Sequence, residues 1–274
     1  MIKLQLLRRI MKTIIYDYPY VFKDNHNEES NVIFVHGFNS SPATFRIFEE
    51  YWKKSNYYAI QFPGNNNTNP VNGHEISVYQ YAKLLVEFVE KNKLKNVTLI
   101  GHSMGGGTIS LAYEMKPELF SKMIYIAPMN KSSLSTVDKY FETYFPKTFD
   151  QFLKFLEALY YDTTRFTSDS RWMNLTQKNF DANYFNNDNI LKLGRSLPNL
   201  QLHNDIEKGL QAIKVPTLLI LGEKDAVIDR DNCLRYFENN VEDIKTIYIP
   251  QTGHMMFEEN WKSFISILEP FLLS

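Results

Sequence analysis

The stretch that decides the fold reads Asn96-Val-Thr-Leu-Ile-Gly-His-Ser-Met-Gly-Gly-Gly107. Its first five residues form a short apolar run typical of a buried strand, and a helical pattern follows its last glycine. Between them, residues 101–105 match the pattern Gly-x-Ser-x-Gly, in which small neighbours leave room for a tight turn. Such a turn holds Ser103 at the carboxyl edge of a sheet and at the start of a helix, whose N–H groups favour developing negative charge. The stretch therefore predicts that Ser103 is a nucleophile.

Short apolar runs alternate with helical patterns on both sides of this stretch. Apolar residues recur every three or four positions over 76–92, and residues 109–115 and 261–273 are also predicted to be helices. The runs expected to be strands, rich in β-branched or aromatic residues, are 13–18, 31–35, 57–62, 96–100, 122–127, 215–221 and 245–249. This alternation predicts an α/β fold with a mostly parallel sheet and crossover helices.

The alternation stops between about residues 130 and 214, where aromatic residues follow a helical spacing and no strand-like run occurs. We interpret residues 131–212 as a helical insertion in a core formed by residues 1–130 and 213–274. Most of its aromatic side chains are expected to pack together, and a minority to line a pocket. The asparagine-rich stretch 64–72 is predicted to be a surface loop without a chemical role.

A serine hydroxyl is a poor nucleophile until a neighbouring base takes its proton, so a histidine must lie near Ser103. The best placed of the six histidines is His254, in a loop between the last predicted strand and the terminal helix. His102 adjoins the serine, but consecutive residues in a sharp turn point apart, so we expect it to pack or bond locally. His36 is expected to brace the site. Surface or loop positions are predicted for the others, His26, His74 and His203.

The histidine needs a carboxylate on its other nitrogen, to fix its tautomer and stabilise the imidazolium. Residues 221–229 follow a strongly apolar strand and offer three acids. We rank Asp225 first, Asp229 second and Glu223 third, although composition alone hardly separates them. The chain order serine, acid, histidine is that of a strand–turn–helix nucleophile on an α/β sheet.

Hydrolysis of an acyl group also requires N–H donors for the oxyanion. The backbone N–H of Met104, directly after the nucleophile, is the first candidate. The loop His36-Gly-Phe-Asn-Ser-Ser-Pro42 follows an early strand, which makes the backbone N–H of Phe38 the second.

Taken together, these motifs resemble the bacterial esterase/lipase branch of the α/β-hydrolase superfamily over nearly the whole chain. The resemblance rests on five motifs in the expected order: His36-Gly-Phe38, Pro63-Gly64, Gly101-His-Ser-Met-Gly-Gly106, Gly222-Glu-Lys-Asp225 and Gly253-His254. It implies an eight-stranded sheet, a helical cap (the insertion) over the active site, and no metal or organic cofactor. It also implies Asp225 as the acid, because the acid of this family usually falls three residues after the strand-ending glycine. Relatives often continue the Pro-Gly turn with His-Gly, whereas Pro63-Gly64 runs into asparagines, a departure that bears on substrate preference.

The composition of the chain narrows the class of ligand. The 30 basic and 31 acidic residues nearly cancel, so nucleic acid or an anionic membrane is not expected as a partner. No run approaches the roughly 18 apolar residues of a membrane span, and residues 1–10 do not match an export signal. Met11 is an alternative start.

The single cysteine, Cys233, fits a reducing compartment and is expected to be a half-buried thiol on a late helix. We therefore predict a cytoplasmic protein without integral membrane association.

The expected reaction is hydrolysis of a small-molecule carboxylic ester with a small to medium apolar acyl group, through an acyl-serine intermediate. A lipase, a thioesterase, a carbon–carbon bond hydrolase or an aminopeptidase-like enzyme would use the same three side chains. Dehalogenases and epoxide hydrolases are disfavoured, since these relatives carry an aspartate where Ser103 stands. A catalytically silent binding protein is the remaining class, which labelling by a fluorophosphonate would separate.

Overall fold

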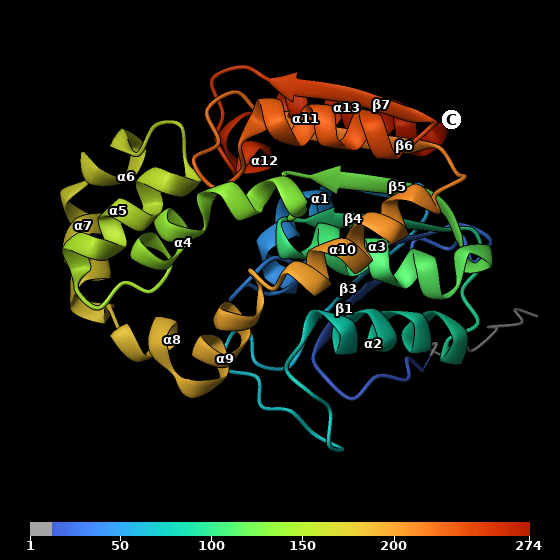
Figure 1. Ribbon diagram of the computed structural model, residues 1–274, viewed down its shortest axis with the longest axis horizontal. Coiled ribbons are helices and arrows are strands. Elements are labelled where there is room, and N and C mark those ends of the chain that lie inside the picture. Colours follow the sequence, from blue (N-terminus) through green and yellow to red (C-terminus); the bar gives the residue numbers. More distant parts are fainter. Residues whose placement is uncertain (1–12) are drawn as a thin grey trace, which may run out of the picture.

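The computed structural model describes residues 13–274, which form a sheet between two layers of helices (Figure 1). The expectations for Met11 and for an export signal lie outside the described residues. Among residues 13–274, no helix combines the length and the apolar character needed to cross a membrane.

The sheet has seven strands in the order β1-β3-β2-β4-β5-β6-β7, and only β1 runs antiparallel to its neighbour. The strands are β1 (Tyr20–Lys23), β2 (Asn31–Val35), β3 (Asn56–Ile60), β4 (Val97–His102), β5 (Phe120–Ile126), β6 (Thr217–Gly222) and β7 (Ile244–Ile249). Every residue of β2, β3, β4 and β6 is buried, as expected for parallel strands covered on both faces. Six of the seven predicted strands are thus confirmed.

The strand predicted at residues 13–18 is wrong, and the sheet described here has seven strands rather than eight. Ile14 and Tyr18 are buried, so the apolar pattern reflects side chains that anchor an irregular segment to the core. The N–H of Ile15 donates to Oδ1 of Asn92 at 2.8 Å, and a side chain thus replaces the ladder partner that a strand would need. Pairing with β3 begins only at Tyr20.

Helices cover both faces of the sheet. One layer contains α2 (Val78–Lys91), α3 (Met104–Met115), α10 (Leu200–Gln211) and α11 (Arg230–Asn240), with α3 packed against both α2 and α10. The other contains α1 (Arg46–Tyr51), α12 (Met256–Glu259) and α13 (Trp261–Leu273), and the rings of Tyr51 and Trp261 join α1 to α13. Two short 3-10 helices, η1 (Pro42–Phe45) and η2 (Pro117–Leu119), complete the core. The helices predicted at 76–92, 109–115 and 261–273 are confirmed.

The segment between β5 and β6 contains helices and no strand, as predicted. Its helices are η3 (Lys131–Thr136), α4 (Val137–Thr143), α5 (Phe149–Leu159), α6 (Thr164–Thr167), α7 (Ser170–Asn179), α8 (Ala182–Asn186), α9 (Asp188–Ser196) and α10. Figure 1 shows α4–α7 beyond the carboxyl ends of the strands, which places them over the edge where Ser103 lies. The last helix, α10, packs on α3 of the core. The division into a core and a cap at residues 131–212 remains a prediction.

Candidate active site

Ser103 occupies a sharp turn between β4 and α3. Its backbone angles are φ 54° and ψ −123°, a conformation that side-chain-bearing residues rarely adopt and that costs free energy unless the surroundings impose it. Three hydrogen bonds impose it: the N–H of Ser103 donates to the carbonyl of Ile126 at 3.0 Å. Its carbonyl accepts from the N–H groups of Gly106 at 2.9 Å and Met129 at 2.8 Å. The turn that the Gly-x-Ser-x-Gly pattern predicts is therefore present.

The glycines of this turn are needed because backbones pass very close to them. A Cβ on Gly105 would lie 2.1 Å from the carbonyl oxygen of Val35 in β2, and one on Gly101 would lie 2.7 Å from the carbonyl oxygen of Gly105. Both distances are far inside van der Waals contact, so any larger residue would push α3 away from the sheet.

His254 and Asp225 form a buried pair at the carboxyl ends of β6 and β7. Nδ1 of His254 lies 2.8 Å from Oδ2 of Asp225, and the two side chains are only 3% and 1% exposed. The other oxygen, Oδ1, accepts from the N–H groups of Val227 at 2.8 Å and Ile228 at 2.9 Å. A carboxylate with these partners holds the Nδ1–H tautomer, which leaves Nε2 of His254 as an acceptor.

The two competing acids are engaged elsewhere. Asp229 is the N-cap of α11, where its Oδ1 accepts from the N–H of Asn232 at 3.0 Å. Glu223 accepts a hydrogen bond from the N–H of Gln251 at 2.7 Å. Neither is paired with His254, so the geometry favours Asp225 over both.

The two histidines beside the serine are buried and neutral. His102 packs as expected, but its bond is not local, since Nε2 lies 3.2 Å from the carbonyl oxygen of His254. Burial, and then repulsion from His254 when that residue is protonated, lowers the pKa of His102. His36 contacts the carbonyl oxygen of Gly37 through Nδ1 at 2.8 Å and accepts from the N–H of Phe62 at Nε2 at 3.2 Å. Through these two contacts His36 braces the loop that carries Phe38. Burial lowers the pKa of His36 to about 4, so its imidazole is neutral at pH 7.

The expectation for His203 is wrong, because this residue is buried on α10 with its Nε2 3.0 Å from the carbonyl oxygen of Leu197. The sequence does not reveal this burial, because α10 lies within the predicted insertion, whereas in the structure it packs on α3 of the core. His26 and His74 lie in loops, as predicted.

Cys233 lies on α11 but is fully buried rather than half-buried, and this burial raises the pKa of its thiol.

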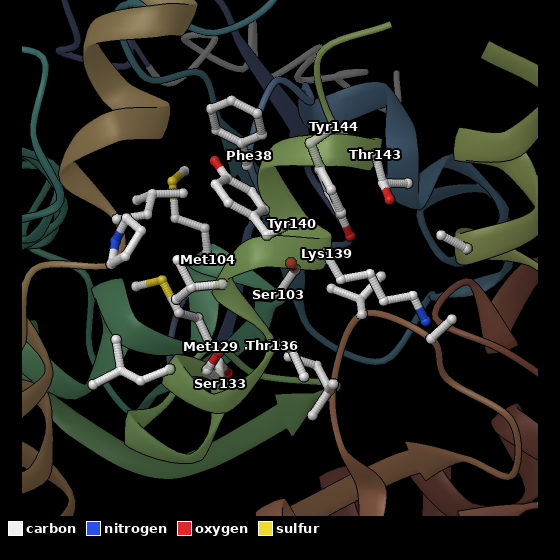
Figure 2. Close-up of a pocket in the computed structure, with 18 of the residues that line it drawn as sticks. Phe38, Ser103, Met104, Met129, Ser133, Thr136, Lys139, Tyr140, Thr143 and Tyr144 are labelled. Atoms are coloured by element: carbon white, nitrogen blue, oxygen red, sulfur yellow. Dashed lines mark hydrogen bonds between the residues drawn. The ribbon is translucent and has the colours of Figure 1, made fainter. Parts of the chain in front are cut away.

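Two pockets meet at Ser103. The first, called here the apolar pocket, is drawn in Figure 2 and is lined mainly by apolar side chains from the start of α3, the loop after β5, η3, α4 and the loop after β6. Among them are Met104, Met129, Leu134, Val137, Val227 and Ile228. The second, called here the histidine-side pocket, is lined by Ser103 and His254 together and carries more polar groups, among them Asn39, Ser40, Thr44 and Glu258. The chain therefore brings Ser103 and His254 to one cavity, although they are far apart in the sequence.

The two candidate oxyanion donors also lie at this point. Met104 is the first residue of α3, where a helix leaves its N–H groups without intrahelical partners. Phe38 lines both pockets, and a Cβ on the preceding Gly37 would lie 3.0 Å from Cβ of Ser103. Both backbones are thus close to the serine.

Three features of the site have no simple signal in the sequence. Tyr144 lines both pockets but is one aromatic residue among many in the insertion. Glu259 accepts hydrogen bonds from the N–H groups of Gly253 at 2.6 Å and Tyr161 at 2.7 Å. It thus joins the insertion to residues 250–255, the loop that carries His254 and is called here the histidine loop. The asparagine-rich loop also contacts the insertion through three pairs: Asn66 with Tyr184, Asn67 with Asn187 and Asn69 with Asn189.

Within residues 13–274, no group of three histidine, cysteine, aspartate or glutamate residues could hold a metal ion.

Comparison with known proteins shows the family to which the chain belongs. The model of the α/β-hydrolase fold family matches residues 31–260. The chain belongs to this family. A Mycoplasma pneumoniae protein named "Putative esterase/lipase 2" is 30% identical over 260 residues, which cover 92% of each chain.

Solved structures of α/β hydrolases share the fold at low sequence identity. An esterase from Exiguobacterium antarcticum superposes with a TM-score of 0.73 at 17% identity, covering 93% of this chain and 95% of its own. The 2-hydroxy-6-oxo-6-phenylhexa-2,4-dienoate hydrolase of Rhodococcus sp. strain RHA1 gives 0.71 at 14% identity, covering 92% of each. Since these two enzymes are named for different reactions, the shared fold alone does not select a substrate.

Proposed function

We propose that this α/β hydrolase is a serine carboxylesterase that cleaves esters of small to medium apolar acyl groups. The observation that carries the proposal is the buried His254–Asp225 pair, whose histidine lines the same cavity as the strained Ser103. A strained nucleophile, a base and an acid that fixes the tautomer of the base are the parts that acyl transfer requires. The relative named as an esterase/lipase supports the same class of reaction.

The proposed reaction has two halves. Oγ of Ser103 attacks the ester carbonyl carbon while Nε2 of His254 takes the hydroxyl proton, and the N–H groups of Phe38 and Met104 stabilise the oxyanion. The C–O bond to the alcohol then breaks, and His254 gives its proton to the leaving oxygen. A water molecule next attacks the acyl-serine with His254 as base, which releases the acid and restores Ser103. Throughout, Asp225 stabilises the positive charge that forms on the imidazole.

The lining of the two pockets supports the proposed substrate. The apolar pocket offers a surface on which an aliphatic or aromatic acyl group loses contact with water, which favours binding by about 0.8 kcal/mol per buried CH₂. The more polar histidine-side pocket suits the alcohol, because it contains the base that must protonate the leaving oxygen.

A panel of p-nitrophenyl esters of rising acyl length, with thioester and amide analogues of one acyl group, tests the proposal. We expect kcat/KM to rise with acyl length and then to fall when the apolar pocket is full, and amides to react far more slowly. The Ser103→Ala variant should lose roughly 10⁴-fold or more of the ester activity while remaining folded. Activity retained in this variant would place the nucleophile elsewhere.

A further inference from the structure

Tyr144 carries a buried hydroxyl at the point where the two pockets meet. Only Phe38, Ser103 and Tyr144 line both the apolar pocket and the histidine-side pocket among the lining residues described. Tyr144 is 9% exposed, and no group within residues 13–274 is a hydrogen-bond partner of its hydroxyl. A buried polar group without a protein partner is unusual, because its desolvation is uncompensated. Figure 2 shows the ring descending from the end of α4 with its hydroxyl towards Ser103.

The surrounding rings fix this orientation. The ring of Tyr144 contacts those of Tyr140 at 4.9 Å, Phe155 at 5.2 Å and Phe38 at 6.4 Å between centroids. Its backbone N–H donates to the carbonyl of Tyr140 at 3.0 Å, which closes the last turn of α4. These three ring contacts restrict the movement of the ring and favour the orientation in which the hydroxyl lies at the junction of the two pockets.

The neighbouring Tyr140 shows what an ordinary tyrosine does in this insertion. Its hydroxyl donates to the carbonyl oxygen of Gly194 at 3.3 Å, and Figure 2 shows it pointing away from Ser103. The two tyrosines lie on one helix end and share a pocket, yet only the hydroxyl of Tyr144 is left for a substrate.

We propose that Tyr144 donates a hydrogen bond to an oxygen atom of the ester group during the reaction, a role that rests on the proposed esterase function. An ester with its acyl part in the apolar pocket and its alcohol part in the histidine-side pocket has its oxygen atoms at the junction that Tyr144 lines. Burial, and then the charge of Asp225, raises the pKa of Tyr144 above its ordinary value. The phenol therefore keeps its proton and remains a donor at neutral pH.

The test compares two tyrosine-to-phenylalanine variants on matched substrates. Tyr57, in β3, is the control, because its hydroxyl is also buried without a protein partner but it lines neither pocket. Neither substitution removes a protein hydrogen bond, so both variants should keep the thermal midpoint of the wild type. We expect Tyr144→Phe to lower kcat for a p-nitrophenyl ester about 10-fold with little change in KM, the loss of one neutral hydrogen bond that forms in the transition state. Tyr57→Phe should stay within about twofold of the wild type, the range left to a variant that touches no reacting group.

An oxygen ester and a thioester of the same acyl group identify the acceptor. Sulfur is a weak acceptor, so a loss confined to the oxygen ester would assign the hydrogen bond to the bridging oxygen. An equal loss on both substrates would assign it to the carbonyl oxygen, and either result supports the proposal. Wild-type kcat and KM in Tyr144→Phe on both substrates, or an equal loss in Tyr57→Phe, would overturn it. A wild-type protein that neither hydrolyses esters nor reacts with a fluorophosphonate would instead refute the proposed function.

Discussion

Asp225 and Asp229 lie four residues apart in the loop after β6, and their surroundings differ sharply. Asp225 has three partners, the imidazole of His254 and two backbone N–H groups, and its side chain is 1% exposed. The carboxylate of Asp229 instead accepts from the backbone N–H and the side-chain amide of Asn232, at the start of α11. In the sequence, only the family resemblance favours Asp225 over Asp229. In the structure, the hydrogen bonds show that Asp225 is the partner of His254 and that Asp229 is the N-cap of α11.

This difference gives opposite expectations for two variants. Asp225→Asn should lower kcat by up to about 10⁴-fold, because the amide no longer holds the required tautomer of His254. Asp229→Ala should instead lower the free energy of unfolding by about 1 kcal/mol through loss of the cap, with kcat little changed. Steady-state kinetics and urea unfolding of both variants check this. Near-normal activity in Asp225→Asn would move the acid role to Asp229 or Glu223.

The pKa of His36 makes stability depend on pH. Its Nε2 accepts from the N–H of Phe62 at 3.2 Å, so a proton on this nitrogen would leave that N–H without its acceptor. Burial lowers the pKa of His36 to about 4 in the folded state, against the ordinary 6.5. Below pH 6.5 the unfolded chain therefore binds a proton at His36 that the folded chain does not bind. The contribution of neutral His36 to the free energy of unfolding is fully present above pH 6.5 and is lost as the pH falls towards 4.

The free energy of unfolding should fall by about 2 kcal/mol between pH 7 and pH 5 through His36 alone. Urea unfolding followed by circular dichroism measures this decrease, and the His36→Gln variant provides the comparison. The variant should be less stable at pH 7 and should show a decrease smaller by about the same 2 kcal/mol. Parallel pH profiles for the two proteins would contradict the low pKa of His36.

At the scale of elements, the histidine loop is tied to the insertion rather than to the core alone. Glu259, at the end of α12, accepts from the N–H groups of both Gly253 and Tyr161. The N–H of Met255 donates to the carbonyl of Leu159 at 3.2 Å, at the end of α5. Met255 is therefore held directly by the end of α5, and Gly253 is linked to the segment after α5 through Glu259.

Glu259→Ala should lower kcat by roughly 10-fold, because a small displacement of a catalytic group is costly in rate. We expect kcat to fall while KM and the fraction of folded protein stay close to those of the wild type. Glu269→Ala is the control: this carboxylate accepts from the hydroxyl of Tyr51 at the surface, and its loss should leave kcat unchanged. If the two variants have equal kcat, the link through Glu259 does not position His254.

The elements that could be predicted from the sequence are those with a strong local pattern. The six predicted strands that the structure contains, and helices such as Trp261–Leu273, follow from apolar runs and helical spacing. The strand at 13–18 could not be rejected, because the decisive partner is the side chain of Asn92, 77 positions away from Ile15. The role of the asparagine-rich loop was missed for the same reason, since its contacts are with residues about 120 positions further along the chain.

In the whole molecule, the fold gathers side chains from the turn after β4, the loop after β6 and the loop after β7 at one edge of the sheet. The parallel register explains this, because the carboxyl ends of neighbouring strands must meet there. The sequence can predict which residue types follow each strand, and thus Ser103, Asp225 and His254. It cannot predict which insertion residues face them, because aromatic residues that pack together and those that line a pocket look alike in the sequence.

The central claim is that Ser103 is activated as a nucleophile at this edge. Its most direct test is a fluorophosphonate probe on the folded protein, followed by mass spectrometry of the digested adduct. We expect one adduct, on Ser103. It should form at wild-type rate in Asp229→Ala, much more slowly in His254→Ala and not at all in Ser103→Ala. An adduct on another residue, or no adduct on folded wild-type protein, would contradict it.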